Sequence, residues 1–178
     1  LDDEQLKWVK ENGGVVQAVA LALFVNKEKH QKHQSAIDSV YRLAAEKLNV
    51  EYLNRRQLYG LSEERQAAYE ETWSAIELEV APALQKVKTT YPAVNVADFV
   101  DHIDYIKDKI GINHVGISSD FDGGGGIEGW QDASETFNVT LELVKRGYTE
   151  EEIGKIWSGN LLRVLDEAEA TAKKIQSE

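Results

Sequence analysis

The chain contains no cysteine and no methionine, and only two of its 178 residues are proline. The absence of cysteine excludes disulfide bonds, thiolate nucleophiles and cysteine metal sites, and it leaves the cellular compartment open. An initiator methionine is normally removed only before a small residue. Because the chain starts at Leu1, we expect it to be a piece of a longer product.

Basic residues are also scarce, since 20 lysines and arginines stand against 31 aspartates and glutamates and give a net charge of −11. A surface that binds nucleic acid or anionic lipid normally carries a basic excess, so neither partner is expected. The longest apolar run, residues 15–25, is too short to span a bilayer and contains Gln17. With 42% hydrophobic and 29% charged residues, the composition is that of a folded globular protein.

Both ends of the chain follow an α/β pattern. Asp2 and Asp3 stand where a helix N-cap belongs, and the glycines after Asn12 should end that helix. The β-branched apolar run at residues 15–25 predicts a strand buried on both faces. Residues 113–119 predict a second short, buried strand. A helix, a turn and a buried strand in succession are typical of a parallel α/β protein.

The middle of the chain is different, because residues 27–91 carry apolar side chains at helical spacing. Ser62 is placed to cap a helix there, and Pro82 should kink or end it. We therefore expect a helical excursion between residues 1–26 and residues 92–178.

Three helices are predicted in the last part of the chain. Asn95 should cap the first, and a capping box of Thr149 and Glu152 should start the third. The apolar spacing predicts the core side of the second and third helices, namely Phe137, Leu141 and Val144 for the one and Ile153, Ile156, Trp157, Leu161, Val164 and Leu165 for the other.

Asp120 directly follows the strand predicted at residues 113–119, where α/β enzymes carry their reactive groups. The glycines at 123–126 would let a backbone pass close to a ligand. A carboxylate there can orient or deprotonate a metal-bound water and then give the proton to a leaving amine. The alternative is a loop aspartate that caps the next turn, and position alone leaves both open. Asp122 points the other way in an extended segment, which favours a turn role.

Two known binding motifs are matched only in part near these aspartates, and we reject both. A calcium loop that starts at Asp120 would need glutamate where Gln131 stands. The glycines at 124, 126 and 129 match a dinucleotide fingerprint, but the two preceding aspartates would repel a pyrophosphate, and no second strand with a ribose-binding acid follows.

The four histidines do not form a recognisable site. His30 and His33 share a helix face, but the lysines around them disfavour a cation, so we expect a solvated basic patch. His102 lies at the edge of an apolar helix stripe and His114 at the strand end away from Asp120, and both are expected to be structural.

Several stretches resemble the renal (membrane) dipeptidase family. Residues 111–123, Gly-Ile-Asn-His-Val-Gly-Ile-Ser-Ser-Asp-Phe-Asp-Gly, resemble the end of its last barrel helix and strand. Residues 143–153, Leu-Val-Lys-Arg-Gly-Tyr-Thr-Glu-Glu-Glu-Ile, and residues 159–165, Gly-Asn-Leu-Leu-Arg-Val-Leu, are similar to its C-terminal helices. Residues 1–6 and 12–16 resemble the segment before its seventh strand.

This resemblance implies an α/β fold, the C-terminal part of a (β/α)8 TIM barrel. Residues 1–26 would be a barrel helix and strand 7, residues 27–91 a helical insertion, and residues 92–178 a barrel helix, strand 8 and C-terminal helices. The insertion is longer than expected, which suggests a lid or an oligomer contact, with a homodimer as one arrangement.

The implied activity is that of a zinc-dependent dipeptidase, a metallopeptidase that hydrolyses the peptide bond of dipeptides by a metal-bound hydroxide. By resemblance, two zinc ions are bound in the intact enzyme, Asp120 handles the proton, and Gly123 and Gly124 border the dipeptide substrate.

The family's metal ligands have no counterpart in this sequence and are expected upstream of Leu1, with the arginine that holds the substrate carboxylate. The chain alone should therefore be inactive and should need the missing N-terminal half of the barrel as its partner. Two alternatives stay open: a non-catalytic binding or assembly module that kept the scaffold, and an amidohydrolase that acts on another amide.

Overall fold

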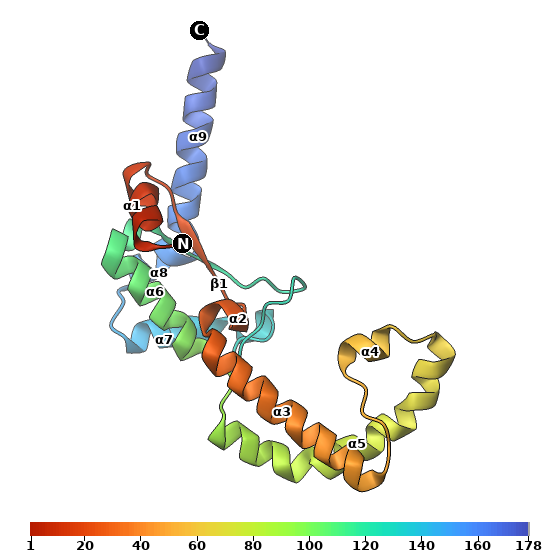
Figure 1. The fold of residues 1–178 in the computed structure, drawn as a ribbon. Coiled ribbons are helices and arrows are strands. Elements are labelled where there is room, and N and C mark those ends of the chain that lie inside the picture. Colours follow the sequence, from red (N-terminus) through yellow and green to blue (C-terminus); the bar gives the residue numbers. More distant parts are fainter. Residues whose placement is uncertain (178) are drawn as a thin grey trace. The chain divides into compact units, whose positions relative to one another are not determined.

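The computed structural model describes residues 1–177, with Arg55 described by its backbone alone, and these residues form two compact units (Figure 1). One unit combines Leu1–Lys27 with Val94–Glu178, and the other is Glu28–Ala93. The first unit holds two parallel strands among its helices, and the second is built from helices, so the chain is mostly helical. Within residues 1–177, every helix is too short or too polar to cross a bilayer.

The two strands are shorter than the sequence predicts. Strand β1 spans Val16–Val19 and pairs in parallel with β2, Val115–Ser118. The apolar run then continues as a short helix, α2 (Ala22–Val25), so the prediction of a strand over residues 15–25 is wrong beyond Leu21. The run stays apolar because α2 packs on the same core, and an unbroken apolar run does not distinguish a strand from a helix. Residues 112–114, which precede β2, form a 3-10 turn.

The two faces of this small sheet differ. Ala18 and Val115 are buried in the core with the helices. Gln17 and Gly116 are register partners and lie on the other face, where the Gln17 amide fills the space above the glycine: a Cβ added to Gly116 would lie 2.6 Å from it. Val19 on this second face is only half-buried, so burial of the first strand on both faces is not observed.

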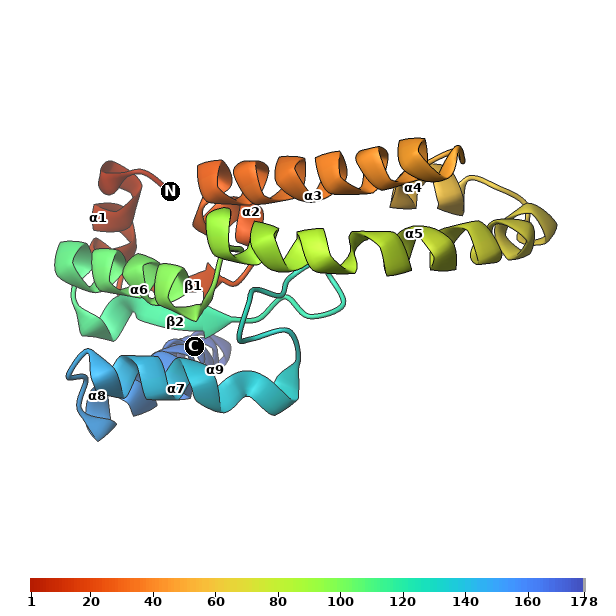
Figure 2. The same ribbon diagram turned by 90° about the horizontal axis from the view of Figure 1, so that it is seen from below.

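Helix α6 (Val96–Ile110) packs against this sheet, as Figure 2 shows. Asn95 caps it as predicted, because its side chain accepts hydrogen bonds from two backbone N–H groups of the first turn. Helix α1 (Asp3–Glu11) packs beside α6 and is capped by Asp2. The buried side chains of α6 form the centre of the core: Val96, Phe99, Val100, Ile103, Ile106 and Ile110.

Helix α7 (Thr136–Lys145) packs on α6 through a different face from the one predicted. It buries Val139 and Leu143, whereas Phe137 is 69% exposed and Val144 is 55% exposed. Because α7 carries apolar side chains on two sides, its periodicity alone does not determine which side is buried.

The last helices form one continuous helical segment. Helix α8 (Glu150–Gly154) passes through a π-helical turn (Lys155–Gly159) into α9 (Asn160–Gln176). Thr149 and Glu152 form the predicted capping box at its start. The wider π turn shifts the helical phase, so Asn160 takes a buried position. Leu161 and Leu165, predicted to lie on the core side, are 50% and 51% exposed.

The second unit consists of α3 (Lys27–Leu48), α4 (Arg55–Tyr59) and α5 (Glu63–Thr90). Helices α3 and α5 lie side by side (Figures 1 and 2) around a small core of Ala44, Ala45, Ile76 and Val80. Pro82 was predicted to kink or end this helix. Helix α5 runs through Pro82, so the proline does not end it. Because proline has no backbone N–H, the carbonyl of Leu78 loses its helical hydrogen bond. Pro82 and Leu78 are both exposed, so water can hydrogen-bond to that carbonyl.

Candidate active site

Asp120 lies two residues beyond the C-terminal end of β2 and beside the end of β1. The chain after β1 is joined to this edge, because the Ala20 N–H donates to the Ser118 carbonyl at 2.9 Å. The Gly126 N–H in turn donates to the Ala20 carbonyl at 3.0 Å, which ties the glycine-rich loop to β1. The half-buried Asp120 is therefore at the sheet edge where the sequence predicted it.

The backbone of Asp120 is held in an unusual conformation. Its φ is 55°, in the left-handed region that few residues other than glycine adopt, although aspartate and asparagine do so more readily. Its carbonyl accepts hydrogen bonds from the N–H groups of Gly123 at 3.1 Å and Gly125 at 2.8 Å. The loop thus folds back onto the residue that starts it and fixes the position of that residue.

An aromatic cluster anchors the same loop to the core. The Phe121 ring meets Trp130 edge-on, with 5.6 Å between ring centroids. Trp130 is only 2% exposed, contacts Phe99 and Trp157, and donates through its indole N–H to the Thr136 hydroxyl at 3.1 Å. Trp130 is not among the residues predicted to matter, although a lone tryptophan in an apolar-poor loop indicates an anchor.

The neighbouring loop residues are less constrained in their surroundings. Asp122 is exposed with a φ of 64°, which fits the turn role favoured by the sequence. Gly124 is exposed with a φ of 108°. That Gly123 and Gly124 border a substrate pocket remains a prediction.

The metal site implied by the family resemblance is not formed by the part of the chain that the structure describes. Within residues 1–177, no three histidine, aspartate or glutamate side chains come together in a group that could hold a metal ion. The described residues therefore do not fit a zinc centre by themselves, because such a centre needs at least three protein ligands.

Two of the four histidines hydrogen-bond to backbone carbonyls. The His114 ring hydrogen-bonds through Nδ1 to the Gly14 carbonyl at 2.8 Å, at the strand ends away from Asp120, which confirms its predicted structural role. His33 was expected in a solvated patch but is half-buried, and its Nδ1 hydrogen-bonds to the Tyr91 carbonyl at 2.6 Å. Half-buried His102 lines a hollow of about 260 Å³ against α1, β1 and α6.

A charged network that the sequence analysis missed joins α6 to α7. The guanidinium of Arg146 donates to the carboxylates of Asp101 (2.6 Å), Asp104 (2.7 Å) and Glu142 (2.9 Å). Burial lowers the pKa of Arg146, but these hydrogen bonds outweigh burial and hold the pKa above its ordinary value. Burial, followed by a hydrogen bond to Asp104, raises the pKa of Tyr148. This network gives the Arg-Gly-Tyr stretch a structural role.

Asn160 connects the C-terminal helices to the start of β2. It is 3% exposed, and its side-chain Nδ2 donates to the carbonyls of Ile112 at 2.7 Å and Val115 at 2.8 Å. The strand that leads to Asp120 is therefore fixed at its entry by a polar side chain from another element.

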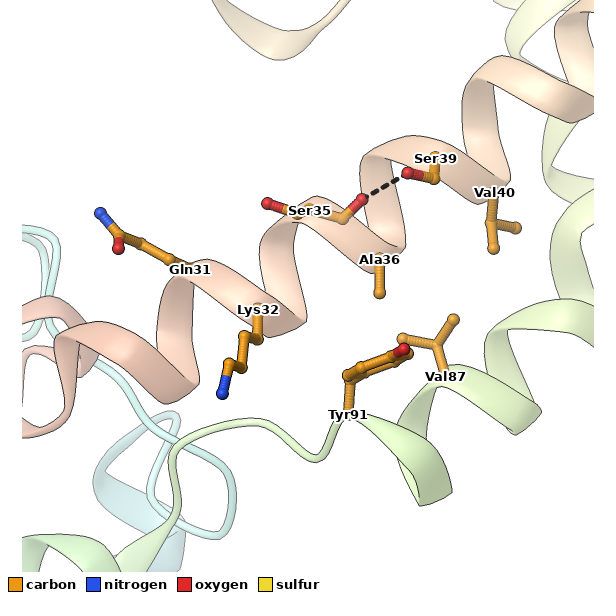
Figure 3. A pocket seen from close by; sticks show the side chains of 8 residues that line it. All are labelled: Gln31, Lys32, Ser35, Ala36, Ser39, Val40, Val87 and Tyr91. Atoms are coloured by element: carbon orange, nitrogen blue, oxygen red, sulfur yellow. Dashed lines mark hydrogen bonds between the residues drawn. The ribbon is translucent and has the colours of Figure 1, made fainter.

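The second unit has a groove of its own, with a volume of about 580 Å³. Figure 3 shows Ala36 and Val40 of α3 pointing toward Val87 and Tyr91. Lys32 and Tyr91 supply its titratable side chains, and Lys32 is ion-paired with Glu28 at 2.6 Å. The described residues that line this groove include no carboxylate and no histidine, and Asp120, at the C-terminal end of parallel strands, remains the candidate for catalysis.

The comparisons with known proteins agree with one another. The family model of membrane dipeptidases, peptidase family M19, matches residues 1–178. Dipeptidase aclJ of Aspergillus oryzae is 39% identical over 84 residues, which make up 47% of this chain and 20% of that protein. Dipeptidase 3 of Rattus norvegicus is 40% identical over 82 residues, or 45% of this chain and 17% of that protein. The matched stretches thus span a fifth or less of these relatives.

A solved structure extends the match to most of the chain. The probable dipeptidase PvdM from Pseudomonas aeruginosa is 33% identical to this chain, with a TM-score of 0.55. The match covers 92% of this chain and 39% of the PvdM chain. The chain belongs to the membrane dipeptidase family, peptidase family M19.

Proposed function

We propose that this chain forms the C-terminal part of a dipeptidase in which Asp120 transfers protons while a dipeptide is hydrolysed. The observation that carries the proposal is the position of Asp120, half-buried at the C-terminal edge of two parallel strands and fixed by its own loop. Barrel enzymes place their reactive groups at this edge. We propose accordingly that β1 and β2 are strands 7 and 8 of a (β/α)8 barrel.

Hydrolysis of a peptide bond requires a group that takes a proton from the attacking water and a group that protonates the leaving amine. One carboxylate can do both in turn if it stays within hydrogen-bond distance of the reacting atoms. The two hydrogen bonds to the Asp120 carbonyl and the aromatic anchor at Phe121 support this role, because they restrict the backbone that carries the carboxylate.

The complete activity is assigned to the whole protein, because this chain spans 39% of PvdM and its matched stretch spans 20% of dipeptidase aclJ. The zinc ions and their ligands would belong to other parts of that protein, since the described residues form no metal site. Gly123 and Gly124 would border the substrate beside Asp120.

The test is Asp120→Asn in the full-length gene product, assayed for dipeptide hydrolysis. We expect kcat to fall by about 10²–10⁴-fold, the contribution typical of a general acid–base group, with zinc content unchanged. Asp122→Asn is the matched control, because it removes an exposed carboxylate of the same loop, and it should retain kcat. Unchanged turnover in Asp120→Asn would refute the assignment. A full-length product that hydrolyses no dipeptide would favour the non-catalytic module.

A further inference from the structure

The glycines that follow Asp120 are required for two different reasons. Gly124 and Gly126 have φ values of 108° and 122°, so the backbone conformation excludes other residues there. Gly123 and Gly125 lie outside this left-handed region, and their backbone would accept a side chain. At these two positions, the restriction is the space around the missing Cβ.

The obstacle at Gly123 is the carboxylate of Asp120. A Cβ added to Gly123 would lie 2.5 Å from Asp120 Oδ1 and 3.1 Å from its Cγ. At Gly125 the obstacle is backbone, because a Cβ there would lie 2.1 Å from the Ser119 carbonyl oxygen and 2.6 Å from that of Asp120. Only at Gly123, of these two, does a side-chain group occupy the space, and a side chain can move where a backbone cannot.

We infer that Gly123 is a positioning residue for Asp120: its missing side chain reserves the space in which the carboxylate lies and so sets the orientation of that carboxylate. The inference rests on the proposed proton-transfer role of Asp120. The N–H of Gly123 also donates to the Asp120 carbonyl at 3.1 Å, so this glycine restrains both the backbone and the side chain of Asp120.

The size of the effect follows from the contact distance. An ordinary contact begins at 3.4 Å, so a methyl group at position 123 requires a shift of about 0.9 Å (3.4 − 2.5) between the two groups. The Asp120 backbone is held by two hydrogen bonds, so the carboxylate takes up the shift. A misplacement of about 1 Å at a reacting group costs about 10²-fold in rate.

The first experiment is a double-mutant cycle on dipeptide hydrolysis by the full-length gene product, with Gly123→Ala, Asp120→Asn and the double variant. We expect Gly123→Ala to lower kcat by about 10²-fold with little change in KM, and the double variant to be no slower than Asp120→Asn. Gly154→Ala is the matched control, because an added Cβ meets nothing within 4 Å and the φ of −59° is helical, and it should retain kcat.

The outcomes separate the two proposals. If Asp120→Asn retains activity, the proposed function fails and the positioning role fails with it. If Asp120→Asn loses activity but Gly123→Ala does not, or if the two losses multiply, the positioning role alone is overturned.

A second cycle measures stability and does not depend on activity. Gly123→Ala should lower the thermal midpoint more in the wild-type background than in Asp120→Gly, where the carboxylate that blocks the new methyl group is gone. This cycle also applies if Gly123→Ala fails to fold, because Asp120→Gly/Gly123→Ala should then fold. An equal loss of stability in both backgrounds, or failure of both proteins to fold, would contradict the inference.

Discussion

Replacing Asn160 with alanine removes two hydrogen bonds that connect α9 to the entry of β2. Each such bond contributes about 0.5–1.5 kcal/mol net. Asn160 is 3% exposed and Val115 is fully buried, so the Val115 carbonyl is poorly placed to find water instead. Alanine is the better helix former and offsets about 0.5 kcal/mol. We expect the free energy of unfolding to fall by about 2 kcal/mol.

Asn138 in α7 provides the matched control for this measurement. Its side-chain Nδ2 also donates to a backbone carbonyl, that of Gly129 at 2.8 Å, but Asn138 is exposed. Asn138→Ala gains the same helix propensity and should change the free energy of unfolding by at most about 0.5 kcal/mol. Urea titrations of the full-length gene product compare the two variants. Equal losses in both would refute the reasoning, because burial would then contribute nothing.

Two further predictions concern protons and metal. Because burial and the hydrogen bond to Asp104 raise the pKa of Tyr148, the stability from its neutral phenol is complete below the ordinary value of 10.0 and is lost as pH rises above it. Tyr148→Phe should therefore be less stable than the wild type at neutral pH. In urea titrations between about pH 9 and about pH 11, its free energy of unfolding should fall less than that of the wild type. An equal fall in both proteins would contradict this. The isolated chain of residues 1–178, dialysed against zinc and analysed for metal, should retain less than one zinc per chain, and stoichiometric zinc would show that it builds a site alone.

Local features of this fold could be predicted from the sequence. Asn95 and the pair Thr149 and Glu152 cap their helices as expected, because a cap depends on residues within one turn. The position of Asp120 was also predictable, because a short apolar run that ends in an aspartate and glycines indicates the end of a buried strand.

The buried helix faces could not be predicted in the same way, because they depend on distant partners. Helix α7 carries apolar side chains on two sides, and only contact with α6 determines that Val139 and Leu143 are buried. The roles of Arg146 and Asn160 depend on partners 42 to 49 residues away in the sequence. A single sequence gives no measure of such contacts.

The steric role of Gly123 could not be predicted from the sequence either. A run of four glycines indicates a flexible loop. An added Cβ would nevertheless meet a different obstacle at Gly123, Gly125 and Gly126 and none at Gly124, and only the structure shows that Gly123 faces the Asp120 carboxylate. The sequence therefore indicated where the candidate site lies, and the structure adds how its carboxylate is held.

The π-helical turn at Lys155–Gly159 limits how this part of the chain can change in length during evolution. Each residue of an α-helix advances the direction of the side chains by about 100°. Loss or gain of one residue in this turn would rotate all of α9 by that angle relative to α8 and would direct Asn160 away from the carbonyls of Ile112 and Val115. Substitutions in the turn can be tolerated singly, whereas insertions and deletions would disconnect the C-terminal helix from the strand that leads to Asp120.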